Sequence, residues 1–244
     1  MTAVKVSVTV VCFITFLIRF RDLRRLRSSG IAHGSVYESK VALTWVTLLL
    51  TCAVLLDVDP VYGAVDAVLG GHNFANLILR GITYALFFLA ATVIARAFNS
   101  MLALWLVKGV PGRVSLIVTV SVTAGSFVFG GFVFGGCIAA YDSFAGWVYA
   151  LIWQIYLAYL AIALLTCLLP AVMTPGGCVV LRVSAALIAI ACLLAISYVP
   201  VRINEEALDG GSVLSNILKM ATVVFVSAGS LTPWVTRRLK FTKP

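Results

Sequence analysis

Residues 146–172 read GWVYALIWQIYLAYLAIALLTCLLPAV, and these 27 positions contain no Asp, Glu, Lys or Arg. An α-helix of about 20 apolar residues is long enough to cross the hydrocarbon core of a bilayer. Inside lipid, the backbone polar groups must bond to each other within the segment, which favours a helix. The stretch therefore predicts a membrane-spanning helix.

Six further apolar segments lie on either side of this stretch. They cover about residues 2–18, 41–56, 74–95, 114–136, 179–199 and 212–235. Over all 244 residues the chain is 62% hydrophobic and 11% charged, which leaves too few polar residues to cover the surface of a soluble protein. The sequence predicts an all-α polytopic bundle of seven transmembrane helices, formed as one domain over residues 1–244.

The charges between these segments predict the orientation of the chain. Alternate loops and the C-terminal tail hold 14 of the 18 Lys and Arg residues. The opposite side holds seven of the nine acids, namely Asp57, Asp59, Asp66, Asp142, Glu205, Glu206 and Asp209. Because cationic flanks are retained in the cytoplasm, we expect the N-terminus outside and the C-terminus inside a bacterial plasma membrane.

The net charge of +9 comes largely from these short clusters beside the membrane. An anionic inner leaflet attracts such clusters, so the charge does not require a nucleic-acid partner. The arginine run from Arg19 to Arg27 is interpreted as a topology anchor. The alternative is a docking surface for a cytosolic protein partner.

The chain also resembles itself at an offset of 140 residues. The identical pairs include Cys52 and Cys192, Pro60 and Pro200, Gly70-Gly71 and Gly210-Gly211, and Asn76 and Asn216. They predict a 3+1+3 arrangement in which helices one to three and five to seven form a parallel repeat, as in some transporters. The alternative is that two outer loops acquired Pro and Gly-Gly independently, because tight turns favour these residues.

Two basic residues interrupt the apolar segments, Arg80 in 74–95 and Lys219 in 212–235, with Asn76 and Asn216 one turn away. A charge at such depth costs several kcal/mol unless it is paired or hydrated, so both should face the bundle interior. One interpretation is a cationic pocket, open to the outside, for a small anionic solute. The other is a structural clasp, in which each cation pairs with an acid of the outer loops.

Polar and small residues on other segments complete the candidate site and its packing. Gln154, Tyr156 and Tyr159 lie deep enough to donate hydrogen bonds between helices, and we include Gln154 and Tyr156 among the pocket candidates. Gly131 and Gly135 have the spacing at which helix backbones approach closely, so they predict central packing or dimerisation. Residues 99–108 predict a short interfacial helix anchored by Trp105.

No catalytic constellation is visible in the sequence. There is no metal-ligand spacing, nucleophile elbow, phosphate loop or intramembrane carboxylate pair, so we expect neither an enzyme nor a metal or cofactor site. Lys219 in a seventh helix would suit a retinal Schiff base, but no carboxylate counter-ion lies in any apolar segment. The remaining functions are a small-solute transporter or solute-binding bundle, a membrane sensor that signals to a cytosolic partner, and a structural or exclusion protein.

Several stretches resemble a family of actinobacterial seven-helix integral membrane proteins that carry a provisional transporter label. The similar stretches are Arg19 to Arg25, Asp57 to Asp66, Gly70 to Ile94 and Tyr141 to Leu169. The resemblance implies a seven-helix bundle and transport of a solute, and it supplies no binding residues. Members commonly continue into a cytosolic domain after the seventh helix, whereas the sequence here ends at Pro244.

Overall fold

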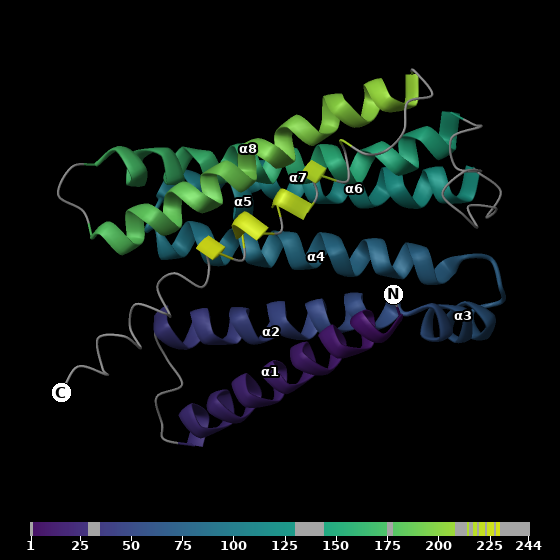
Figure 1. Cartoon of the computed structure of the whole chain (residues 1–244), viewed down its shortest axis with the longest axis horizontal. Coiled ribbons are helices and arrows are strands. Elements are labelled where there is room, and N and C mark those ends of the chain that lie inside the picture. Colours follow the sequence, from purple (N-terminus) through teal and green to yellow (C-terminus); the bar gives the residue numbers. More distant parts are fainter. Residues whose placement is uncertain are drawn as a thin grey trace. The chain divides into compact units, whose positions relative to one another are not determined.

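Every element of the described structure is an α-helix, which confirms the predicted all-α class. The computed structural model describes residues 2–28, 35–129, 144–174 and 178–207, and single positions between 214 and 229. The helices are α1 Thr2–Ser28, α2 Ser35–Leu56, α3 Asp59–Val68, α4 Phe74–Ala97, α5 Met101–Lys108, α6 Val110–Phe129, α7 Phe144–Met173 and α8 Val179–Ala207 (Figure 1).

Four stretches of the described chain are long and apolar enough to cross a bilayer. They are Phe74–Ala97, Met101–Phe129, Phe144–Met173 and Val179–Asn204, with mean hydropathies from 1.5 to 2.6. Lys40–Leu56 and Asp59–Val68 form a fifth span if they are counted together, although the two helices are bent by 89°. The chain therefore has the helices of a multi-pass membrane protein. Seven spans and their orientation stay predictions.

α1 and α2 lie side by side as a helical hairpin (Figure 1). The predicted first segment ended at Ile18, but α1 continues through the arginine run to Ser28. Arg and Leu are good helix formers, and cations are favoured near a helix C-terminus, so the run extends the helix instead of ending it.

The segment between α2 and α4, which was predicted only as a loop, contains the short helix α3. Pro60 sits in the first turn of this helix, where its missing N–H costs nothing. Gly70 and Gly71 then adopt φ values of 100° and 71°, which glycine reaches without strain.

Two side-chain contacts tie this loop to α4. The Tyr62 hydroxyl donates to Asn73 Oδ1, and the Ala75 N–H donates to Asp66 Oδ1 at 3.4 Å. Asp66 thereby accepts from the first turn of α4, where a helix has free N–H groups and favours negative charge.

α5 is present as predicted, but it continues in α6 instead of forming a separate interfacial helix. The two helices together make one candidate span of 29 residues, Met101–Phe129. The Ser100 hydroxyl accepts from the Ala103 N–H and caps α5, and Asn99 with φ 50° makes the turn from α4. Gly109 and Gly112 lie at the junction, where α6 comes very close to the backbone of α5.

α8 packs closely against the described part of segment 212–235. Ser184 Oγ donates to the carbonyl oxygen of Gly229 at 2.6 Å. A Cβ atom on Gly229 would lie 2.7 Å from Ile188 Cγ1 and 3.1 Å from the Ser184 carbonyl oxygen. Glycine is therefore needed for this approach, in the way that small residues admit neighbouring helices in membranes.

We expect Gly229→Ala to lower the free energy of unfolding by about 1–2 kcal/mol, since the added methyl group must push α8 away. Unfolding by dodecyl sulfate in mixed micelles measures this change. Gly81→Ala in α4 is the matched control, because a Cβ there would meet nothing within 4 Å. Equal effects of the two substitutions would contradict the close packing.

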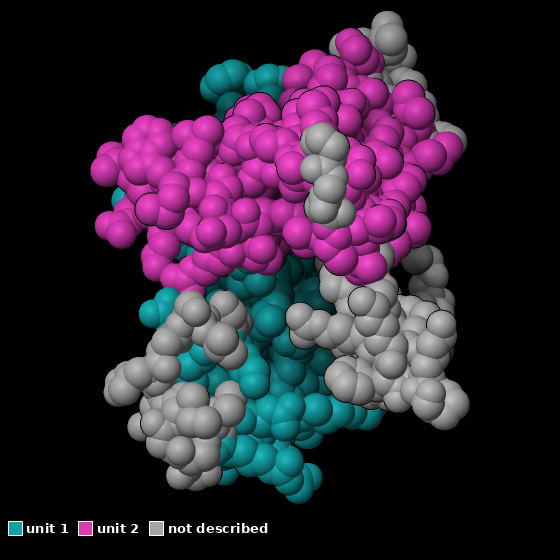
Figure 2. Space-filling view, turned by 90° about the vertical axis from the view of Figure 1, so that its left-hand side faces the viewer, with its two compact units in different colours: residues 1–93, 116–153 teal, residues 94–115, 154–244 magenta. Residues whose placement is uncertain are grey.

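The chain divides into two compact units (Figure 2). Unit 1 comprises residues 1–93 and 116–153, and unit 2 comprises residues 94–115 and 154–244. Unit 1 therefore holds α1 to α3, most of α4, most of α6 and the first third of α7. The candidate site described below is built entirely from unit 1.

The predicted repeat is not demonstrated. Pro60 lies in the first turn of α3, after a sharp bend, whereas its counterpart Pro200 lies inside the continuous α8. The glycine pair at 210–211 and Asn216 lie outside the described residues. The repeat therefore stays a prediction, and the local structure at its two prolines differs.

Candidate functional site

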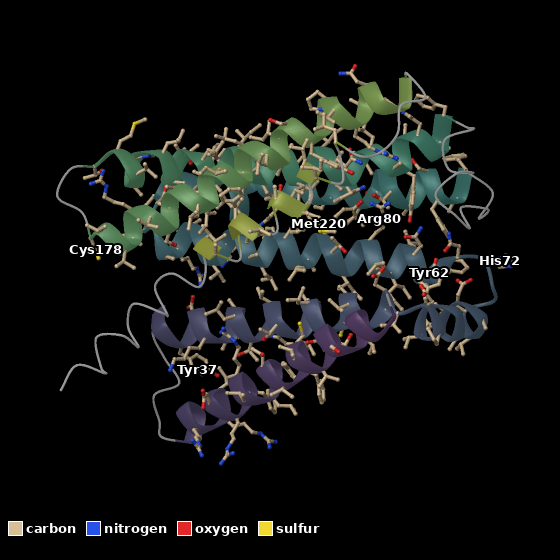
Figure 3. The ribbon with its side chains drawn as sticks, in the orientation of Figure 1. Tyr37, Tyr62, His72, Arg80, Cys178 and Met220 are labelled. Atoms are coloured by element: carbon tan, nitrogen blue, oxygen red, sulfur yellow. The ribbon has the colours of Figure 1, made fainter. Side chains whose placement is uncertain are left out.

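Arg80 lies inside an apolar helix and contacts aromatic rings. It is the seventh residue of α4, about 9 Å along the helix from Phe74, and its side chain is half-buried. The guanidinium carbon Cζ lies 5.2 Å from the ring centroid of Tyr149 and 5.2 Å from that of Trp153. Figure 3 labels Arg80 on its helix.

The spacing of the two rings follows from the geometry of α7. Tyr149 and Trp153 are four residues apart, so they lie on the same face of the helix, one turn from each other. A cation over an aromatic face gains about 1 kcal/mol at an exposed site and about 2 kcal/mol or more when it is desolvated. Two such contacts hold the guanidinium against α7.

A third helix closes the packing behind these rings. The Phe127 side chain of α6 is fully buried, and its ring centroid lies 6.1 Å from that of Tyr149 and 5.5 Å from that of Phe74. We call Phe74, Arg80, Phe127, Tyr149 and Trp153 the Arg80 cluster. It draws on α4, α6 and α7.

One turn further along α4, a buried hydrogen bond fixes α4 to α6. The Tyr84 hydroxyl and Thr123 Oγ1 are 2.8 Å apart, and both side chains are almost fully buried. Thr123 Oγ1 also donates to the Thr119 carbonyl oxygen. These bonds set the position of Phe127, one turn beyond Thr123 on α6, relative to Arg80.

Arg80 carries the only charge in the parts of the three helices that form the cluster, residues 74–93, 116–129 and 144–153. The ring faces contact the guanidinium, whereas a guanidinium binds anions through the N–H groups in its plane. The site can therefore offer an anion a fork of N–H donors in a medium of low dielectric constant, where charge-assisted hydrogen bonds are strong.

The structure places the other predicted pocket residues in different settings. Asn76 is half-buried and lies one turn from Arg80, on the same face of α4. Gln154 and Tyr156 are buried in unit 2, and Gln154 Oε1 has no hydrogen-bond partner among the described residues. Lys219, Asn216, Gly131 and Gly135 lie outside the described residues, so the shared pocket and the glycine packing stay predictions.

The clasp interpretation predicted acids around Arg80. In the described part of the chain its contacts are aromatic, and Asp66 instead accepts from the first turn of α4. The predicted donation between helices is present for Tyr159, whose hydroxyl donates to the Leu106 carbonyl oxygen at 2.6 Å. Sequence reasoning assigned Tyr149 and Trp153 no role beside Arg80. Their four-residue spacing on an uncharged helix was the signal available.

Within the described residues, no group of three or more His, Cys, Asp or Glu side chains is arranged to hold a metal ion. Comparison of the chain with protein-family models, curated proteins and solved structures gives no match. The resemblance to the actinobacterial family therefore stays a prediction, and any function has to be argued from the site.

Proposed function

We propose that this chain is a multi-pass membrane protein whose helix bundle binds a small anionic solute, as a transporter or a solute-binding protein. The observation that carries the proposal is the position of Arg80, whose guanidinium lies over two aromatic rings inside apolar helices. We also propose that the protein lies in a bacterial plasma membrane in the predicted orientation. The N-terminal end of α4, which carries Arg80, would then face the outside.

The cost of placing Arg80 in the membrane and the gain from its cation–π contacts are of similar size. Insertion scales assign about 2.5–3.5 kcal/mol to a charge at the bilayer centre. Two cation–π contacts return about 1–4 kcal/mol, from the exposed to the desolvated limit. The rings therefore offset much of the cost of placing Arg80 in the bundle without a ligand, and an anion adds hydrogen bonds that the ring faces do not supply.

A sensor is the second candidate, and α1 favours it. The arginine run lies on a continuous helix, and Arg21, Arg24 and Arg25 are exposed on it. A cationic helix beyond the membrane suits an acidic cytosolic partner. A sensor would use the same anion site without moving the solute.

The first test measures whether anions stabilise the protein through Arg80. The full chain in phosphatidylcholine nanodiscs is melted in sodium chloride, methanesulfonate, sulfate or phosphate at equal ionic strength. At 100 times its Kd, a ligand stabilises the folded state by about 2.7 kcal/mol. We expect at least one anion to raise the Tm of the native chain and not that of Arg80→Met. If no anion separates the two proteins, the proposal is wrong.

The second test separates the candidates. Uptake of the radiolabelled stabilising anion into proteoliposomes, lost in Arg80→Met, identifies a transporter. Stabilisation without uptake rules out transport and leaves the solute-binding or sensor role. In that case, a partner retained by the native chain and released by Arg21→Ala/Arg24→Ala/Arg25→Ala identifies the sensor.

A further inference from the structure

We infer that the Arg80 cluster selects a monovalent organic anion with an apolar body, over small divalent anions such as sulfate. The inference rests on the proposed function, because it names the chemical class of the solute bound at the same site. Two independent features of unit 1 support it, namely the charge of the site and the side chains that flank it.

The first feature is the single positive charge. Residues 74–93, 116–129 and 144–153 contain Arg80 and no other charged side chain. A monoanion paired with Arg80 leaves the site neutral, whereas a dianion leaves one negative charge without a partner among apolar helices. An uncompensated charge in such a medium is costly, so a dianion loses more by leaving water than it gains.

The second feature is the apolar surface beside the guanidinium. Asn76 and Leu77 precede Arg80 by four and three residues, so they share its face of α4. Leu77 and Phe74 are only partly buried where they pack against Phe127 and Tyr149, and Trp153 is also partly exposed. A solute whose acid group binds Arg80 would bring its body against these side chains, and apolar contact would add to the affinity.

Asn76 supplies a side-chain amide on this face, whereas the hydroxyls of Thr83 and Tyr84 on the same face bond to Leu79 and Thr123. Its amide can donate to one oxygen of an acid group, while Arg80 donates to the others. One guanidinium fork and one amide suit a compact acid group with a single charge. They do not match the spread of donors that a small dianion would require.

Trp153 provides a reporter inside the site, because its ring lies 5.2 Å from Arg80 Cζ. The chain has five tryptophans. Replacing Trp45, Trp105, Trp147 and Trp234 by Phe leaves Trp153 as the only one. The full-length single-tryptophan protein in phosphatidylcholine nanodiscs is titrated with benzenesulfonate, methanesulfonate and sulfate. These salts share a sulfur–oxygen acid group, keep their charge at neutral pH, and differ in net charge and body.

We expect benzenesulfonate to change Trp153 emission saturably, with a Kd at least about 10-fold below that of methanesulfonate and about 100-fold below that of sulfate. Arg80→Met in the same background should abolish the response. A response that survives in Arg80→Met would show partition into lipid and overturn the inference. If the single-tryptophan protein does not fold, the same order is measured by the Tm of the native chain.

The outcomes separate this inference from the proposed function. If sulfate binds as tightly as benzenesulfonate, the site still binds anions, but selection of a monovalent apolar solute is wrong. If none of the three changes the emission or the Tm, the proposed function fails as well. As a last measurement, the benzenesulfonate titration is repeated in nanodiscs that include phosphatidylglycerol. If phosphatidylglycerol abolishes the benzenesulfonate response, the site binds a lipid headgroup. That result would overturn the inference that its ligand is a soluble solute.

Discussion

Gly112→Ala should lower the free energy of unfolding by about 3 kcal/mol, at the upper end of what overpacking costs. The added Cβ atom would overlap the carbonyl group of Val107 and lie 2.6 Å from the Leu106 carbonyl oxygen. These are backbone atoms at the end of α5, so no side-chain rotation relieves the collision. The junction of α5 and α6 must open, which displaces the helix that carries Thr123 and Phe127.

Gly125→Ala is the matched control in the same helix. A Cβ there would meet nothing within 4 Å, and alanine is a better helix former than glycine by up to about 1 kcal/mol. Unfolding by dodecyl sulfate should therefore separate the two variants by about 3–4 kcal/mol. If Gly112→Ala is as stable as Gly125→Ala, the close approach of α5 and α6 is wrong.

Arg80→Glu should have the second large effect, a loss of about 3 kcal/mol together with all anion binding. It exchanges two attractive cation–π contacts for a carboxylate against the negative faces of Tyr149 and Trp153. Residues 74–93, 116–129 and 144–153, which form the cluster, hold no other cation with which this carboxylate could pair. Unfolding and the anion-dependent Tm measure the two losses.

Arg80→Met separates a binding site from a structural clasp. It removes the cation–π contacts and the cost of a charge in the membrane together, and these two effects are of similar size. We therefore expect its stability without anions to lie within about 1 kcal/mol of the native chain. A loss above about 2 kcal/mol would show that Arg80 mainly holds the helices together.

The sequence predicted those helices that depend on length and apolar composition alone. α4, α7 and α8 begin within two residues of the predicted positions, because long uncharged segments have few other structures available in a membrane. Elements whose ends depend on local contacts were missed. α3 requires the turn at Pro60 and the capping by Asp66, and the junction of α5 and α6 requires a backbone approach that composition does not encode.

The sequence likewise predicted part of the candidate site and missed the rest. Arg80 was evident, because a charge within an apolar segment needs a partner. The identity of the partner was not, since both acids and aromatic rings can stabilise a guanidinium. Only the folded arrangement shows that α7 places Tyr149 and Trp153 against it. Gln154 was predicted for the same pocket; it follows Trp153 directly on α7 and is buried, and its place in the pocket stays a prediction.

The most direct measurement is a crystal structure of the full chain grown with 4-bromobenzenesulfonate, with bromine located by anomalous scattering. The account predicts the sulfonate oxygens on the in-plane N–H groups of Arg80 and the bromine beside Leu77 and Trp153. It also predicts that the guanidinium stays over the rings of Tyr149 and Trp153. Bromine found only elsewhere, with Arg80 paired to a carboxylate of the outer loops, would contradict it.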